Sequence, residues 1–144
     1  MDIFSTEDQD RIVQTISLAE AQTSGEIRLV IDKKLSEPSA MEAAVRYFRK
    51  LNMQQTVQKN GVLIYLATDD HAFAIIGDAG IDKYVGPDFW DETKEQMAVL
   101  FRQGDLVQGL IVGIQHIGEQ LKTYFPRRAD DINELPDDIY FGKN

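Results

Sequence analysis

The sequence lacks cysteine altogether, and its 144 residues include only two histidines, four prolines and one tryptophan. Without cysteine the chain forms no disulfide, holds no zinc through thiolates and carries no cysteine nucleophile. Neither histidine, His71 or His116, is accompanied by a serine in a nucleophile elbow, so the sequence offers little support for nucleophilic catalysis. A Walker loop and a dinucleotide fingerprint are also missing, because residues 77–80 (GDAG) have neither the lysine nor the spacing.

Long apolar runs and targeting signals are missing as well. The apolar stretch 110–114 near the end of the chain is far shorter than the ~20 residues that span a bilayer. Residues 1–8 are acidic and lack the basic and apolar regions of a signal peptide. These features predict no membrane span and a cytoplasmic location.

Basic residues are in the minority. Lys and Arg number 15 against 24 Asp and Glu, which gives a formal charge of −9. Such a surface repels phosphate backbones and predicts no nucleic-acid partner, since the basic pair Arg127-Arg128 is followed at once by Asp130-Asp131. The excess carboxylates have two interpretations. They form a solvated surface, or some of them converge on a hard cation that prefers oxygen ligands.

The apolar pattern predicts one α/β domain over residues 1–126, followed by an acidic tail over 127–144. Runs of β-preferring residues at 61–67 and 72–77 flank the polar segment 68–71 and predict a β-hairpin. Residues 26–32 alternate as a strand, and a helical stripe from 40 to 51 separates them from 61–67, which predicts a parallel crossover. Further helices are expected from Ser5 or Thr6 to Gln22, from Pro87 or Asp88 to Gly104, and from Asp105 to Pro126, with one helical turn at 81–85. In the tail, residues 139–141 are expected to be extended and to dock on the body.

Strand direction predicts which carboxylates meet. Strands 26–32 and 61–67 start at the sheet edge where strand 72–77 ends, so Glu26 and Asp78 are expected there, and segment 80–91 brings Asp82 and Asp88. Calcium or magnesium requires several carboxylate and carbonyl oxygens at about 2.0–2.6 Å, so these four residues are the predicted metal ligands. Their spacing does not match an EF-hand loop, and turn-forming or capping aspartates remain the alternative interpretation.

The opposite edge of the sheet gathers a second set of polar residues. Asp32, Asp69, Asp70 and His71 follow strands that end there, and the turn before the last helix brings Asp105 back toward them. Asp69, Asp70, His71 and Asp105 are therefore secondary candidates for a site.

Six short motifs occur in an order and spacing that resemble those of the TPM domain family. They are residues 23–27 (TSGEI), 60–64 (NGVLI), 77–82 (GDAGID), 89–90 (FW), 101–105 (FRQGD) and 124–126 (YFP). The family includes thylakoid-lumen phosphatase-like proteins, a photosystem II repair factor and many bacterial proteins. This chain is most similar to the small, free-standing bacterial members, some of which bind calcium.

The resemblance implies a three-layer α/β/α sandwich around a short mixed β-sheet. It also implies binding of a divalent metal and, for the plant members, acid phosphatase activity. Glu26 matches the glutamate of the family's first strand, Asp82 falls where many members have a glutamate, and Asp105 matches the aspartate of the Gly-Asp pair. Many members carry arginine or lysine where this chain has His71.

Three functional hypotheses remain open. The first is a soluble domain that holds a divalent cation, with calcium favoured and magnesium as the alternative, in a structural or regulatory role. The second is a metal-assisted phosphatase-like hydrolase, with Asp78 or Asp82 as a ligand and His71 or Asp105 as the proton carrier. The third is a non-catalytic module that binds an unidentified protein partner through the acidic tail or an exposed aromatic residue.

Overall fold

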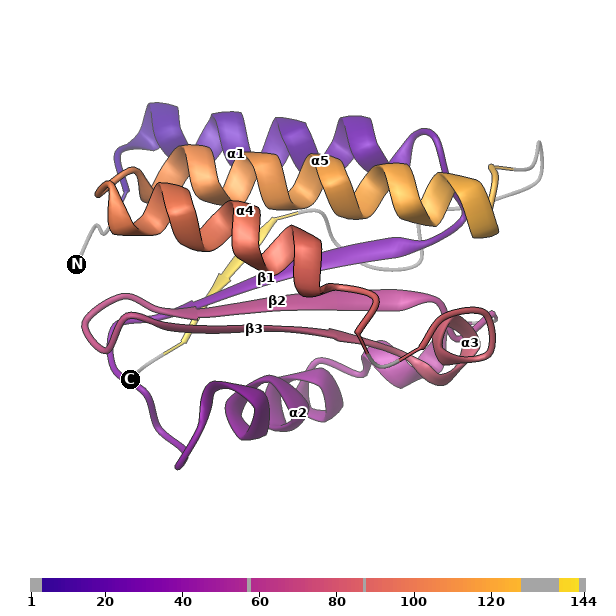
Figure 1. The fold of residues 1–144 in the computed structure, drawn as a ribbon, viewed down its shortest axis with the longest axis horizontal. Coiled ribbons are helices and arrows are strands. Elements are labelled where there is room, and N and C mark those ends of the chain that lie inside the picture. Colours follow the sequence, from indigo (N-terminus) through magenta and orange to yellow (C-terminus); the bar gives the residue numbers. More distant parts are fainter. Residues whose placement is uncertain (1–3, 57, 87, 128–137, 143–144) are drawn as a thin grey trace.

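The computed structural model describes residues 4–56, 58–86, 88–127 and 138–142, and it shows three layers. A four-stranded sheet separates α2 on one face from α1, α4 and α5 on the other, while α3 lies at one end of the sheet (Figure 1). The predicted α/β/α sandwich around a short mixed sheet is confirmed. The elements in chain order are α1 (Thr6–Glu20), β1 (Glu26–Asp32), α2 (Ala40–Lys50), the 3₁₀ helix η1 (Met53–Gln55), β2 (Gly61–Ala67), β3 (Ala72–Gly77), α3 (Ala79–Asp82), α4 (Asp91–Arg102), α5 (Leu106–Tyr124) and β4 (Ile139–Phe141).

The sheet has the strand order β3-β2-β1-β4. Strands β1 and β2 are parallel, with Glu26 opposite Gly61, and β2 and β3 form the antiparallel hairpin, as predicted. The fourth strand, β4, comes from within the predicted tail and pairs parallel with the free edge of β1. The expectation that residues 139–141 dock on the body is therefore confirmed, and they do so as a strand.

Burial explains why β2 shows no polar alternation. Every residue of β1 and of β2 is buried, because helices cover both faces of the sheet. The isoleucines and leucines of alternate positions, such as Ile27 and Leu29, pack under α1, α4 and α5. The intervening positions, among them Val30, Leu63 and Tyr65, pack against α2.

Helix ends follow the capping signals. The side chains of Ser5, Ser39 and Asp105 each accept a backbone N–H three residues on, at 3.1 Å, and begin α1, α2 and α5. Helix α4 begins only at Asp91, whereas Pro87 or Asp88 was predicted, and Pro87 lies outside the described residues. The intervening stretch makes i→i+3 bonds, which wind more tightly than an α-helix and turn Trp90 into the core.

None of the helices in the described ranges is both long and apolar enough to cross a membrane.

Candidate functional site

The first two predicted ligands, Glu26 and Asp78, lie at the edge of the sheet where β1 and β2 begin and β3 ends, and on the same face of the sheet. Glu26 is in register with Gly61. The N–H of Asp78, directly after β3, donates to the carbonyl of Gly61 at 2.9 Å. Because residues in register on neighbouring strands share a face, Glu26 and Asp78 flank Gly61 on the α2 side of the sheet. Met53 of η1 packs over Gly61, with its Cε 3.3 Å from where a Cβ would stand.

Asp78 has an incomplete set of hydrogen bonds. Its Oδ1 accepts the N–H of Ala79 at 2.7 Å and so caps α3. Its Oδ2 is buried and finds no hydrogen-bond donor among the described residues. A buried carboxylate oxygen without a donor is costly, so such atoms are normally satisfied by water or by a cation. The chemistry of this oxygen therefore fits a cation ligand.

The other two predicted ligands do not complete a cluster. Asp82, at the end of α3, and Asp88, before α4, are both exposed. Within the described ranges, no three or more His, Cys, Asp or Glu side chains form a group that could hold a metal ion. The strand register thus brings together two of the four predicted ligands, Glu26 and Asp78, on either side of Gly61. Glu26 is 2% exposed.

At the opposite edge the acidic residues serve the turns. The N–H of Asp69 donates to the carbonyl of Lys33 at 2.7 Å, and Oδ2 of Asp70 accepts the N–H of Leu35 at 2.5 Å. These bonds tie the hairpin turn to the loop after β1. His71 is exposed and has a left-handed backbone, with φ at 52°.

Asp105 is exposed in the turn between α4 and α5, and it caps α5 through Oδ1. The structure therefore shows a turn-forming role for Asp70 and a capping role for Asp105.

Asp32 forms a polar cluster inside the α2 layer. Its carboxylate is fully buried and accepts the hydroxyl of Tyr65 at 2.7 Å and the hydroxyl of Tyr47 at 2.9 Å. Gly142 closes the cluster, because a Cβ there would lie 1.7 Å from Oδ1 of Asp32. The two tyrosines were visible in the sequence only as part of apolar patterns, so this cluster was not foreseen.

The family model of the TPM domain matches residues 1–120. The chain belongs to the TPM domain family. Among solved structures it is similar to the BA42 protein of the psychrophilic bacterium Bizionia argentinensis, with 43% identity, a TM-score of 0.91, and coverage of 98% of this chain and 97% of that one.

Two more distant structures share the fold of this TPM domain. The N-terminal domain of a P. gingivalis protein has 16% identity and a TM-score of 0.70, covering 86% of this chain and 80% of that one. The N-terminal domain of the cg2496 protein of Corynebacterium glutamicum has 13% identity and a TM-score of 0.66, covering 83% and 74%. The search of curated proteins found no match.

Two of the sequence motifs meet in the folded TPM domain. The N–H of Ser24 donates to the carbonyl of Phe125 at 2.9 Å, and the hydroxyl of Thr23 donates to the same carbonyl. Thr23 and Pro126 form an isolated β-bridge beside this contact. These bonds fasten the end of α5 to the start of β1, so the motifs at 23–27 and 124–126 have a structural role.

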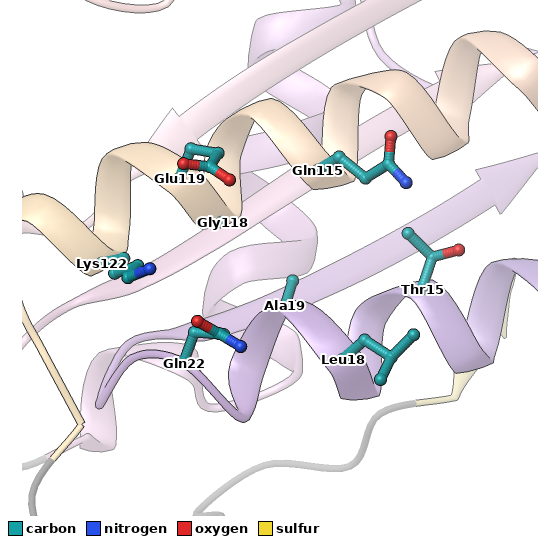
Figure 2. Close-up of a pocket in the computed structure, with 8 residues that line it drawn as sticks. All are labelled: Thr15, Leu18, Ala19, Gln22, Gln115, Gly118, Glu119 and Lys122. Carbon is teal, nitrogen blue, oxygen red and sulfur yellow. The ribbon is translucent and has the colours of Figure 1, made fainter.

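The TPM domain has a shallow groove on its helical layer, between α1 and α5 (Figure 2). Its volume is about 270 Å³. The helices approach closely there because Gly118 has no side chain: a Cβ would fall 2.8 Å from Cβ of Ala19. Leu18 is exposed at the rim, where Glu119 and Lys122 also lie. None of the predicted site residues lines this groove.

The Asp32 cluster predicts a loss of stability in alkali. Burial, with the hydrogen bond to Asp32 as a second cause, raises the pKa of Tyr47 to about 12, and the same two causes raise the pKa of Tyr65 well above its usual value. In the unfolded chain these tyrosines lose their protons near pH 10, whereas in the folded chain they keep them. Between about pH 10 and 12, each tyrosine therefore lowers the free energy of unfolding by roughly 1.4 kcal/mol for every pH unit. We expect the free energy of unfolding to fall steeply over this range in urea titrations.

The matched control is the double variant Y47F/Y65F, which has no titrating hydroxyl in the cluster. Its stability is expected to change much less from pH 10 to 12. Parallel pH profiles for the variant and the unaltered protein would contradict the assignment.

Proposed function

We propose that this TPM domain binds a divalent cation, calcium in the first place and magnesium as the alternative, in a structural or regulatory role. The cation binds at the sheet edge formed by Glu26, Gly61 and Asp78. The observation that carries the proposal is Oδ2 of Asp78, a buried carboxylate oxygen without a hydrogen-bond donor among the described residues. A cation at this oxygen would replace the missing donor.

Calcium fits this edge better than magnesium. Calcium accepts six to eight oxygens in irregular geometry, whereas magnesium demands a near-ideal octahedron and gives up its waters reluctantly. With two carboxylates in the row, the remaining ligands are backbone carbonyls and water. Exposed Asp82 and Asp88 are the predicted ligands that would have to move to join them. The formal charge of −9 raises the local concentration of cations around the whole chain.

Calorimetric titration of the chelator-treated protein with calcium chloride tests the proposal. We expect a saturable heat with a dissociation constant on the order of 0.1–1 mM, as for sites with few carboxylates. Asp78→Asn should weaken binding at least about tenfold, because the change removes the charge but keeps an oxygen that can cap α3. Asp10→Asn, which alters an exposed acid on α1, is the matched control for net charge and should bind like the unaltered protein.

Two results would overturn the proposal. One is the absence of a saturable heat at calcium concentrations well above the expected constant. The other is an unaltered calcium affinity of Asp78→Asn together with a loss of calcium binding in Asp70→Asn. That result would place the cation at the hairpin turn. A rise in the unfolding temperature with calcium would assign a structural role, since a ligand of the native state stabilises it by mass action.

A further inference from the structure

A second hollow lies between the β2–β3 hairpin and helices α4 and α5. The hairpin turn and the α4–α5 turn lie at the same end of the molecule (Figure 1). The hollow has a volume of about 250 Å³ and is separate from the edge that carries Asp78. Strands β2 and β3 supply one wall, and helices α4 and α5 supply the other. The lining residues are Leu66, Thr68, His71, Phe73, Ala98, Phe101, Arg102 and Leu106.

The walls of this hollow are mainly apolar, and aromatic packing holds them in place. Phe73 and Phe101 contact edge to face, with ring centroids 5.0 Å apart and planes at 89°. Phe101 rests against α5 at Gly109, where a Cβ would fall 2.5 Å from its Cε1. Because this glycine lets the ring approach α5 closely, and because Ala98 is small, the space between the walls stays open.

Polar groups stand together at the hollow. Thr68 and His71 come from the hairpin turn, and Arg102 comes from the last turn of α4. Thr68 is held by its N–H, which donates to the carbonyl of Asp32 at 3.0 Å. Arg102 pairs with Glu95 at 3.3 Å, but the side chains are 64% and 70% exposed, and such exposed pairs contribute little. The guanidinium is therefore free to exchange this partner for another carboxylate.

The neighbouring acids do not occupy the hollow. No Asp or Glu is among the described residues that line it. Asp70 is engaged with the N–H of Leu35, and Asp105 with the N–H of Gln108. Asp69, next to Thr68, is exposed. Arg102 is thus the charged group of the lining, in a chain whose overall charge is strongly negative.

We infer that this hollow is a binding site for a small monocarboxylate with a compact apolar body, such as an aromatic or short-chain carboxylic acid. The apolar body contacts Phe73 and Phe101, and the carboxylate pairs with Arg102 and accepts the hydroxyl of Thr68. Typical ligand pockets measure roughly 300–1,000 Å³, so this smaller hollow suits a molecule of fragment size. An arginine fork matches the geometry of a carboxylate, which favours an acid over a neutral analogue of the same shape.

Benzoate and its neutral analogue benzamide are the probes, titrated into the ¹⁵N-labelled full chain with a chelator present so that no divalent cation takes part. We expect saturable amide shifts confined to residues 66–73 and 98–106, with a benzoate dissociation constant on the order of 1 mM. Benzamide is expected to bind at least about fivefold more weakly, because it cannot pair with the guanidinium.

Three variants sharpen the test. Arg102→Gln should lower benzoate affinity to that of benzamide and leave benzamide unchanged, while Arg49→Gln, at an exposed arginine on α2, should change neither. Ala98→Leu, which fills the space, should weaken both probes. The inference is overturned by absence of saturable shifts, by equal affinity for the two probes, or by benzoate binding to Arg102→Gln as to the unaltered protein. Because Arg102 is exposed, its replacement leaves the fold intact. Benzoate binding by Arg102→Gln therefore decides the matter.

Discussion

Replacing Asp32 by alanine is expected to lower the free energy of unfolding by about 3–5 kcal/mol. The carboxylate accepts the hydroxyls of Tyr47 and Tyr65, and all three residues are buried. Alanine leaves both hydroxyls without an acceptor and leaves a cavity beside Gly142. Urea denaturation at pH 7, followed by far-ultraviolet circular dichroism, measures the difference.

Two further variants separate the hydrogen bonds from the cavity. Asp32→Asn keeps an acceptor oxygen and nearly the same volume, so its cost is expected to be about 1–2 kcal/mol. Tyr65→Phe removes one donor and should cost about 1 kcal/mol. If the free energy of unfolding of Asp32→Ala lay within about 0.5 kcal/mol of that of the unaltered protein, the prediction would be wrong. Water would then reach the cluster in solution.

Replacing Gly80 by alanine is expected to lower the free energy of unfolding by about 2–4 kcal/mol. A Cβ at this position would fall 2.1 Å from the carbonyl oxygen of Gln58 and 2.5 Å from that of Lys59. Both atoms belong to the backbone, so no side-chain rotation relieves the overlap. The N–H of Gly80 also donates to the carbonyl of Lys59 at 2.8 Å, and this bond would be lost as α3 moves away. Thermal and urea unfolding measure the effect.

Gly86→Ala is the matched control, because a Cβ at Gly86 meets no atom within 4 Å. Its stability should stay within about 0.5 kcal/mol of the unaltered protein. Equal stability of Gly80→Ala and Gly86→Ala would contradict the close docking of α3. Since α3 begins at the cap made by Asp78, Gly80→Ala is also expected to weaken the proposed calcium binding.

The sheet was accessible from sequence because its signals are local. The apolar runs at 61–67 and 72–77 predict the hairpin, and the helical stripe after residues 26–32 predicts the parallel pairing. Strand direction then places Glu26 and Asp78 at one edge, which the register confirms. A carboxylate at a strand end is positioned by the strand, so its place follows from topology.

The rest of the candidate site depends on packing that no local pattern encodes. Asp82 and Asp88 were expected to fold over the edge, but α3 docks on the backbone of residues 58–59 and leaves them exposed. The Asp32 cluster needs a tyrosine from α2 and one from β2, and which polar atoms meet is set by how α2 lies across the sheet. The hollow at Arg102 likewise requires Phe101 to lie against Gly109.

The position of β4 has a consequence for how the polypeptide matures. β1 leaves the ribosome before β4, its partner on one side, because residues 33–138 lie between the two strands in the chain. Until β4 has been synthesised, the backbone amides and carbonyls on that side of β1 have no strand to pair with. Unpaired strand edges of this kind can associate between nascent chains. The four-stranded sheet is complete only after residues 139–141 have been synthesised.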